Sequence, residues 1–100
     1  MSQLEQSFEN RIRAAVIKCH QLGYNPSDFE GMLRVSSATR VAEKLVTSGK
    51  LQTGLQRLAQ MGRLDLSVES IMLESQFEPL FTKQHLEAAQ WRLNQVSVHC

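Results

Sequence analysis

The chain has 100 residues, of which 42% are hydrophobic, and this suits one domain over residues 1–100 built on a single core. Its net charge of +1 excludes a strongly acidic mimic of nucleic acid and a strongly basic nucleic-acid coat. Five glycines and two prolines, with no low-complexity stretch, argue against a disordered chain.

Apolar residues spaced three and four apart predict a first helix from about Leu4 to Leu22. Gly23 is suited to ending it, because glycine readily adopts the left-handed conformation common after a last helical turn. Cys19 falls on the apolar stripe, so we expect it in the core. A second helix is predicted to begin with Asn25 as its N-cap and Pro26 at its first helical position.

A third helix is predicted after Ser36 or Ser37, either of which can cap it, and it is expected to end at Gly49. A fourth is predicted from near Thr53 to Gly62. Both helices have an apolar side and should pack by it. The apolar residues are Val41, Ala42, Leu45 and Val46 in the third helix and Leu55, Leu58 and Ala59 in the fourth.

Asp65 or Ser67 can cap a short fifth helix, which cannot continue past Pro79 because proline lacks an amide donor. Thr82 caps the last helix. The apolar face of that helix comprises Leu86, Ala89, Leu93 and Val96. The sequence therefore predicts an all-α fold, a compact bundle of about five to six short helices with longer helices at both ends.

No arrangement of residues in the sequence suggests chemistry. The histidines at positions 20, 85 and 99 have no nucleophile placed beside them, and together with two cysteines they are too scattered for a zinc site. The glycines occur singly, which is not the pattern of a phosphate-binding loop. We expect no catalytic residue, no metal and no cofactor.

The segment 1–9 lacks the basic residues and apolar run of a signal peptide, and no stretch is apolar enough to span a membrane. The two cysteines do not form the paired framework of a small secreted fold. We therefore expect a cytoplasmic protein.

Basic residues are concentrated in the middle of the chain. Residues 31–63 carry six of them against one acid, Glu43, a net charge of +5. The six are Arg34, Arg40, Lys44, Lys50, Arg57 and Arg63. Residues 64–82 carry no base and four acids, which we interpret as a solvated face: Asp65, Glu69, Glu74 and Glu78. The basic side chains are either the outer sides of ordinary helices or a docking site for an anionic partner.

Trp91 lies roughly 140° from Leu86 around the last helix, at about 100° per residue, and so falls on its polar side. An exposed tryptophan is a candidate interface anchor, because a desolvated aromatic ring contributes much of the binding energy. The alternative is that a loop or the first helix covers it. Our candidate partner-binding residues are Trp91, Arg34, Arg40, Lys44, Arg57 and Arg63.

The segment Gly62–Glu69, followed by Leu80–Thr82, and an earlier segment beginning at Tyr24–Pro26 resemble a widespread family of small uncharacterised prokaryotic helical proteins. The resemblance covers about residues 20–95, while Ser36–Ser37 and Leu55 depart from the family pattern. Its matching positions are mostly caps and core residues, so it implies a common fold more than a common activity.

In size and character the chain is also similar to helical anti-CRISPR proteins of phages and mobile elements that act on type I-F surveillance complexes. This similarity implies a non-enzymatic protein in a prokaryotic cell that binds Cas subunits and blocks target DNA binding. One alternative is a nucleic-acid-binding regulator of helix-turn-helix type, for which Gln52, Gln56, Arg57 and Gln60 supply few base-reading side chains. Another is an accessory or antitoxin-like interaction domain. We expect no membrane partner and no small-molecule substrate.

Overall fold

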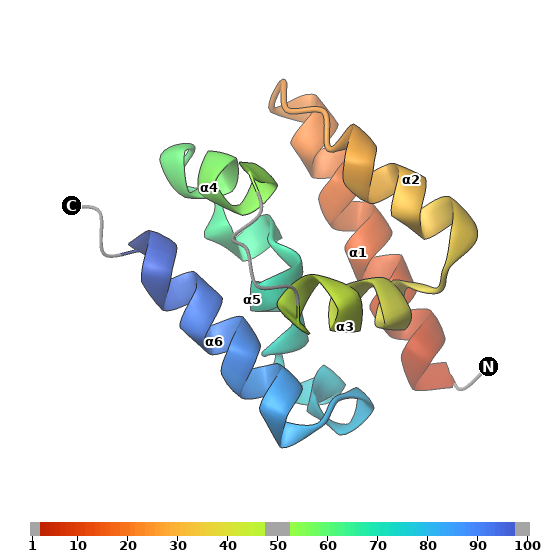
Figure 1. Cartoon of the computed structure of the whole chain (residues 1–100). Coiled ribbons are helices and arrows are strands. Elements are labelled where there is room, and N and C mark those ends of the chain that lie inside the picture. The colour runs from red at the N-terminus through yellow and green to blue at the C-terminus, as the bar shows by residue number, and fades with distance from the viewer. Residues whose placement is uncertain (1–2, 48–52, 98–100) are drawn as a thin grey trace.

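The computed structural model describes residues 3–47 and 53–97, and within these ranges the chain is helical without a β-strand (Figure 1). The α-helices are α1 (Gln3–Gln21), α2 (Ser27–Val35), α3 (Ala38–Thr47), α4 (Thr53–Gln60), α5 (Val68–Met72) and α6 (Lys83–Ser97). Two 3₁₀ helices, η1 (Leu64–Leu66) and η2 (Ser75–Leu80), flank α5. The predicted all-α bundle is confirmed, with its longest helices, α1 of 19 residues and α6 of 15 residues, near the two ends.

The shortest α-helix, α5, lies at the centre of the bundle. Its residues Val68, Glu69, Ile71 and Met72 are all buried. Helices α1, α3 and α6 pack around it, as Figure 1 shows. A five-residue helix is not stable alone in water, so these surrounding helices stabilise it.

Three phenylalanines hold the N-terminal helix to the segment after α5. The ring of Phe8 on α1 lies edge-on to Phe77 and Phe81, with ring centroids 5.2 and 5.3 Å apart. Edge-to-face contacts of this kind add to the free energy gained by burial alone. Pro79 sits within η2, and α5 has already ended at Met72, so the predicted break after the fifth helix is present but begins earlier.

Three of the predicted caps are confirmed. The Ser37 hydroxyl accepts from the Arg40 amide at 3.3 Å at the start of α3. The Ser67 hydroxyl accepts from the Ser70 amide at 3.1 Å, and Asp65, the other candidate at that position, lies in η1. The Thr82 hydroxyl accepts from the His85 amide at 3.2 Å at the start of α6.

The predicted cap at Asn25 is wrong. Pro26 occupies the N-cap position of α2 without a side-chain hydrogen bond, and the helix begins at Ser27. The reason is the tight turn after α1, in which Gly23 has φ +87° and the Ser27 amide donates to the Asn25 carbonyl oxygen. Leu22, predicted on the buried stripe, belongs to this turn and is exposed. The end predicted at Gly49 lies outside the described residues.

Candidate functional site

Trp91 projects from the outer side of α6. Its side chain is 57% exposed, which agrees with the helical arithmetic and excludes a covering loop or helix. The opposite side of α6 is fixed in the bundle by Ala89, Arg92 and Val96, all buried. A large aromatic ring is therefore presented to solvent by a helix whose own position is set by packing.

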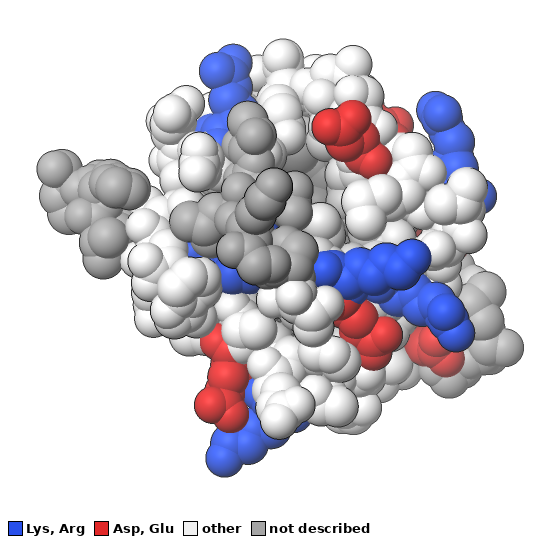
Figure 2. Space-filling model, in the orientation of Figure 1, with Lys and Arg blue, Asp and Glu red and all other residues white. Residues whose placement is uncertain are grey.

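Two of the predicted basic residues, Arg40 and Lys44, lie one turn apart on α3. They line a shallow hollow together with Glu43, Thr47 and His85. The Nδ1 atom of His85 on α6 is 3.9 Å from the Glu43 carboxylate, so the hollow lies where α3 meets α6. Figure 2 shows Lys and Arg side chains gathered over α3 with acidic side chains beside them, a mixed surface rather than a purely basic one.

The remaining basic candidates lie on other elements. Arg34 is exposed on the last turn of α2, and Arg57 is exposed on α4. Arg63 donates two hydrogen bonds to the Asp65 carboxylate, at 3.0 and 3.1 Å, and this pairing holds the pKa of Asp65 below its usual value. On the face seen in Figure 2 the basic side chains form several separate groups, one of them over α3 and others toward the edges. The basic run in the sequence therefore does not become one continuous basic surface there.

The acidic residues that follow in the sequence form the predicted solvated face only in part, because Asp65 and Glu78 are exposed but Glu69 is buried. Glu74 pairs with Arg11 of α1 at 3.1 Å, and Asp65 pairs with Arg63. The prediction is most clearly wrong for Glu69, which is only 3% exposed. The dipole of charge along the sequence is thus largely neutralised in space by bases from other segments.

Glu69 and Arg92 form a buried ion pair between α5 and α6. The Arg92 Nε donates to Glu69 Oε2 at 2.9 Å, and Arg92 is 1% exposed. Removing each ion from water costs several kcal/mol, and the pair is tolerated because each charge is compensated by the other. Sequence analysis missed this contact.

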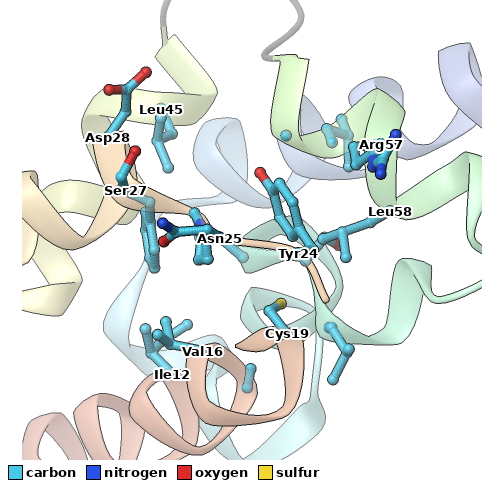
Figure 3. Close-up of a pocket in the computed structure, with 18 of the residues that line it drawn as sticks. Ile12, Val16, Cys19, Tyr24, Asn25, Ser27, Asp28, Leu45, Arg57 and Leu58 are labelled. Atoms are coloured by element: carbon cyan, nitrogen blue, oxygen red, sulfur yellow. The ribbon is translucent and has the colours of Figure 1, made fainter. Parts of the chain in front are cut away.

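Sequence analysis also missed a cavity of about 350 Å³ between α1, α2 and α4, which is open to solvent on one side. Its wall is mainly apolar. The wall includes Ile12 and Val16 of α1, Met32 of α2, Leu45 of α3, and Leu55 and Leu58 of α4. Phe29 and Met32 of α2, predicted to be buried, are only partly buried and border this space. Figure 3 shows the α1 side chains below the space and α4 to its right.

Polar side chains surround the mouth of the cavity. Asn25, Ser27, Asp28 and Arg57 lie there with Tyr24, whose ring stands between Asp28 on one side and Arg57 on the other in Figure 3. Burial raises the pKa of the Tyr24 phenol, so its hydroxyl keeps its proton at neutral pH and can donate a hydrogen bond.

Two small features fix the floor and one side of the cavity. Cys19 of α1 is buried, as predicted, and burial raises the pKa of its thiol, which keeps it uncharged at neutral pH. Gly54 of α4 allows the Tyr24 ring to approach closely, since a Cβ atom there would lie 2.5 Å from the hydroxyl oxygen. The position of Tyr24 at the mouth thus depends on the absence of a side chain at residue 54.

Residues 3–47 and 53–97 contain no group of three or more His, Cys, Asp or Glu side chains placed to hold a metal ion. Among the same residues, no helix has the length and apolar character needed to cross a membrane.

Comparison with known proteins returned no match among protein-family models, curated proteins or solved structures. The resemblance to small prokaryotic helical proteins therefore stays a prediction.

Proposed function

We propose that this protein is a non-enzymatic binding domain that contacts a protein partner through the Trp91 surface, the outer side of α6 around Trp91, Glu87 and Asn94. The observation that carries the proposal is the 57% exposure of the chain's only tryptophan on a helix anchored by buried residues. An aromatic ring held in this way loses little conformational entropy on binding. Neighbours such as Glu87 and Asn94 are exposed polar residues suited to the rim of an interface.

The partner we propose is a Cas subunit of a type I-F surveillance complex, so that binding blocks target DNA. This more specific proposal rests on the similarity in size and character to helical anti-CRISPR proteins. Its physical support is the near-neutral charge and the mixed surface over α3, which suit contact with protein better than imitation of DNA.

A helix-turn-helix regulator has less support from the geometry. Gln56, Arg57 and Gln60 are exposed on α4, but α4 packs mainly against α6 and η1 rather than forming a close pair with α3. The next helix, α5, is buried along most of its length and is too short to enter a groove. We therefore do not propose DNA binding, and the experiment below includes an assay that would detect it.

The experiment is capture of a purified type I-F surveillance complex by the tagged protein, beside a gel-shift assay with random duplex DNA at two salt concentrations. We expect the complex to be captured and free DNA not to shift. Trp91→Ala should weaken capture by about 30-fold, equivalent to the loss of about 2 kcal/mol at a central anchor, with an unchanged helical circular dichroism spectrum.

Val35→Ala is the matched control, because Val35 is an 84% exposed apolar residue on a different helix. Equal capture by wild type and Trp91→Ala would remove Trp91 from the interface. Absence of any capture together with a salt-dependent DNA shift would replace this proposal by the regulator.

A further inference from the structure

The cavity between α1, α2 and α4 is large for a chain of this length. Its volume of about 350 Å³ is more than twice that of the roughly 150 Å³ apolar cavity that accommodates benzene in another protein. Packed protein interiors leave few voids larger than a water molecule. A space of this size falls in the range of small-molecule sites, about 300–1,000 Å³, and fits an apolar body of two fused rings.

The walls specify an apolar occupant. Val16 reaches the space from α1 and Leu58 from the opposite side on α4, while Met32, a flexible side chain, borders it from α2. Glu69 is the one acid at the inner end, and its carboxylate already accepts from Arg92. Apolar walls favour an apolar occupant, because water needs two to four polar partners and finds few of them along these walls.

The mouth specifies the polar end of that occupant. Arg57 supplies a positive charge, and the Tyr24 hydroxyl lies between it and Asp28. The Asp28 carboxylate points away from the space in Figure 3, and it lies in the first turn of α2, where the positive end of the helix offsets its charge. Among the described residues that line the space, Arg57 is the one cation that an incoming anion can contact.

We propose that the cavity binds a small aromatic carboxylate, with a fused-ring body among the apolar walls and its carboxylate at the mouth against Arg57 and the Tyr24 hydroxyl. The site is separate from the Trp91 surface. A carboxylate suits it because a guanidinium and a phenolic hydroxyl both donate hydrogen bonds, and a carboxylate has only acceptors.

The test uses β-naphthoate as the probe and its neutral analogue β-naphthamide for comparison. Binding is followed by chemical shifts in amide nitrogen–proton correlation spectra and by calorimetry. We expect β-naphthoate to shift resonances of cavity residues such as Val16 and Leu58, and to raise the melting temperature. The amide should bind about fivefold more weakly, the size of effect expected when an exposed charged contact is lost.

Two variants locate the site. Val16→Phe fills the cavity and should reduce binding at least about tenfold, because the ring occupies the space the probe needs. Its matched control is Ile17→Phe, an exposed neighbour on α1 that does not line the cavity. Arg57→Gln should abolish the preference for the carboxylate over the amide, whereas Arg34→Gln, an exposed arginine on α2, should leave it intact.

Several results would overturn the proposal. One is the absence of shifts at cavity residues at millimolar β-naphthoate. Another is full binding by a correctly folded Val16→Phe variant, which would place the probe elsewhere. Equal affinity for acid and amide would remove the carboxylate from the proposal. None of these results depends on capture of a protein partner, so this inference and the proposed function fail separately.

Discussion

Replacing Arg92 by Met should destabilise the fold strongly. The change leaves the Glu69 carboxylate, 3% exposed, without the guanidinium whose Nε lies 2.9 Å away. Breaking a buried ion pair from one side costs about 3–5 kcal/mol. Both side chains are almost fully buried, so we expect a loss of about 3 kcal/mol or more. Since a typical domain is stable by about 5–15 kcal/mol, such a loss is a large fraction of the total.

The assay is urea unfolding at neutral pH followed by circular dichroism, for Glu69→Met, Arg92→Met and the double variant. The free energy of unfolding of the double variant should be within about 1 kcal/mol of the wild-type value, or higher, because two methionines of suitable volume leave no buried charge. The control is Arg11→Met, which breaks the partly exposed pair with Glu74 and should cost under about 1 kcal/mol. A loss under about 1 kcal/mol for Arg92→Met would show that Glu69 is solvated, and strictly additive single effects would show that the two residues are not coupled.

Glycine substitutions give two further predictions, each measured as a change in the urea midpoint. Gly54→Ala should lower stability by about 1 kcal/mol, since its Cβ would lie 2.5 Å from the Tyr24 hydroxyl oxygen. In a Tyr24→Phe background the same change should raise stability by about 0.5–1 kcal/mol, because the nearest remaining ring atom lies 3.8 Å from that Cβ. A loss of stability in both backgrounds would contradict the close approach of the Tyr24 hydroxyl to Gly54. Gly62→Ala should cost about 1–2 kcal/mol, as Gly62 has φ +71°. Gly31→Ala, inside α2 with open space around it, should instead gain about 0.5–1 kcal/mol, and equal effects at the two positions would contradict the assigned backbone.

The parts of the fold that depend on short stretches of sequence could be predicted. The stripe through Phe8, Ile12 and Ala15 places one side of α1 in the core, and these residues are buried. Ser67 and Thr82 cap helices because a hydroxyl at that position reaches an amide of the first turn. The prediction at Asn25 failed because the backbone of a tight turn, rather than a side chain, accepts the hydrogen bond from Ser27.

The buried ion pair could be predicted only in part. Helical periodicity places Arg92 within about 60° of Ala89, on the inner side of α6. Its position therefore predicts burial, but arginine is seldom fully buried, and so the residue type argues against it. Glu69 has no such signal, because α5 is too short to show a period and is surrounded on nearly every side. That the two meet is a consequence of how α5 and α6 pack, and charge counting along the chain cannot supply it.

The cavity and the Trp91 surface lie on different parts of the bundle. A substitution in one site can therefore serve as a control for binding at the other. The residues that line the cavity come from α1, the turn after it, α2, α3, α4 and the η1–α5 segment, and in the described part of the chain none belongs to α6. Trp91→Ala should therefore leave β-naphthoate binding unchanged, and Val16→Phe should leave partner capture unchanged, because neither substitution alters a residue of the other surface. If Trp91→Ala weakened both, the cause would be a shift of α6 transmitted to the cavity lining, for which the buried ion pair of Arg92 with Glu69 is a candidate route. The Arg92→Met variant would then reproduce the loss of β-naphthoate binding with Trp91 in place, which distinguishes a transmitted shift from direct contact.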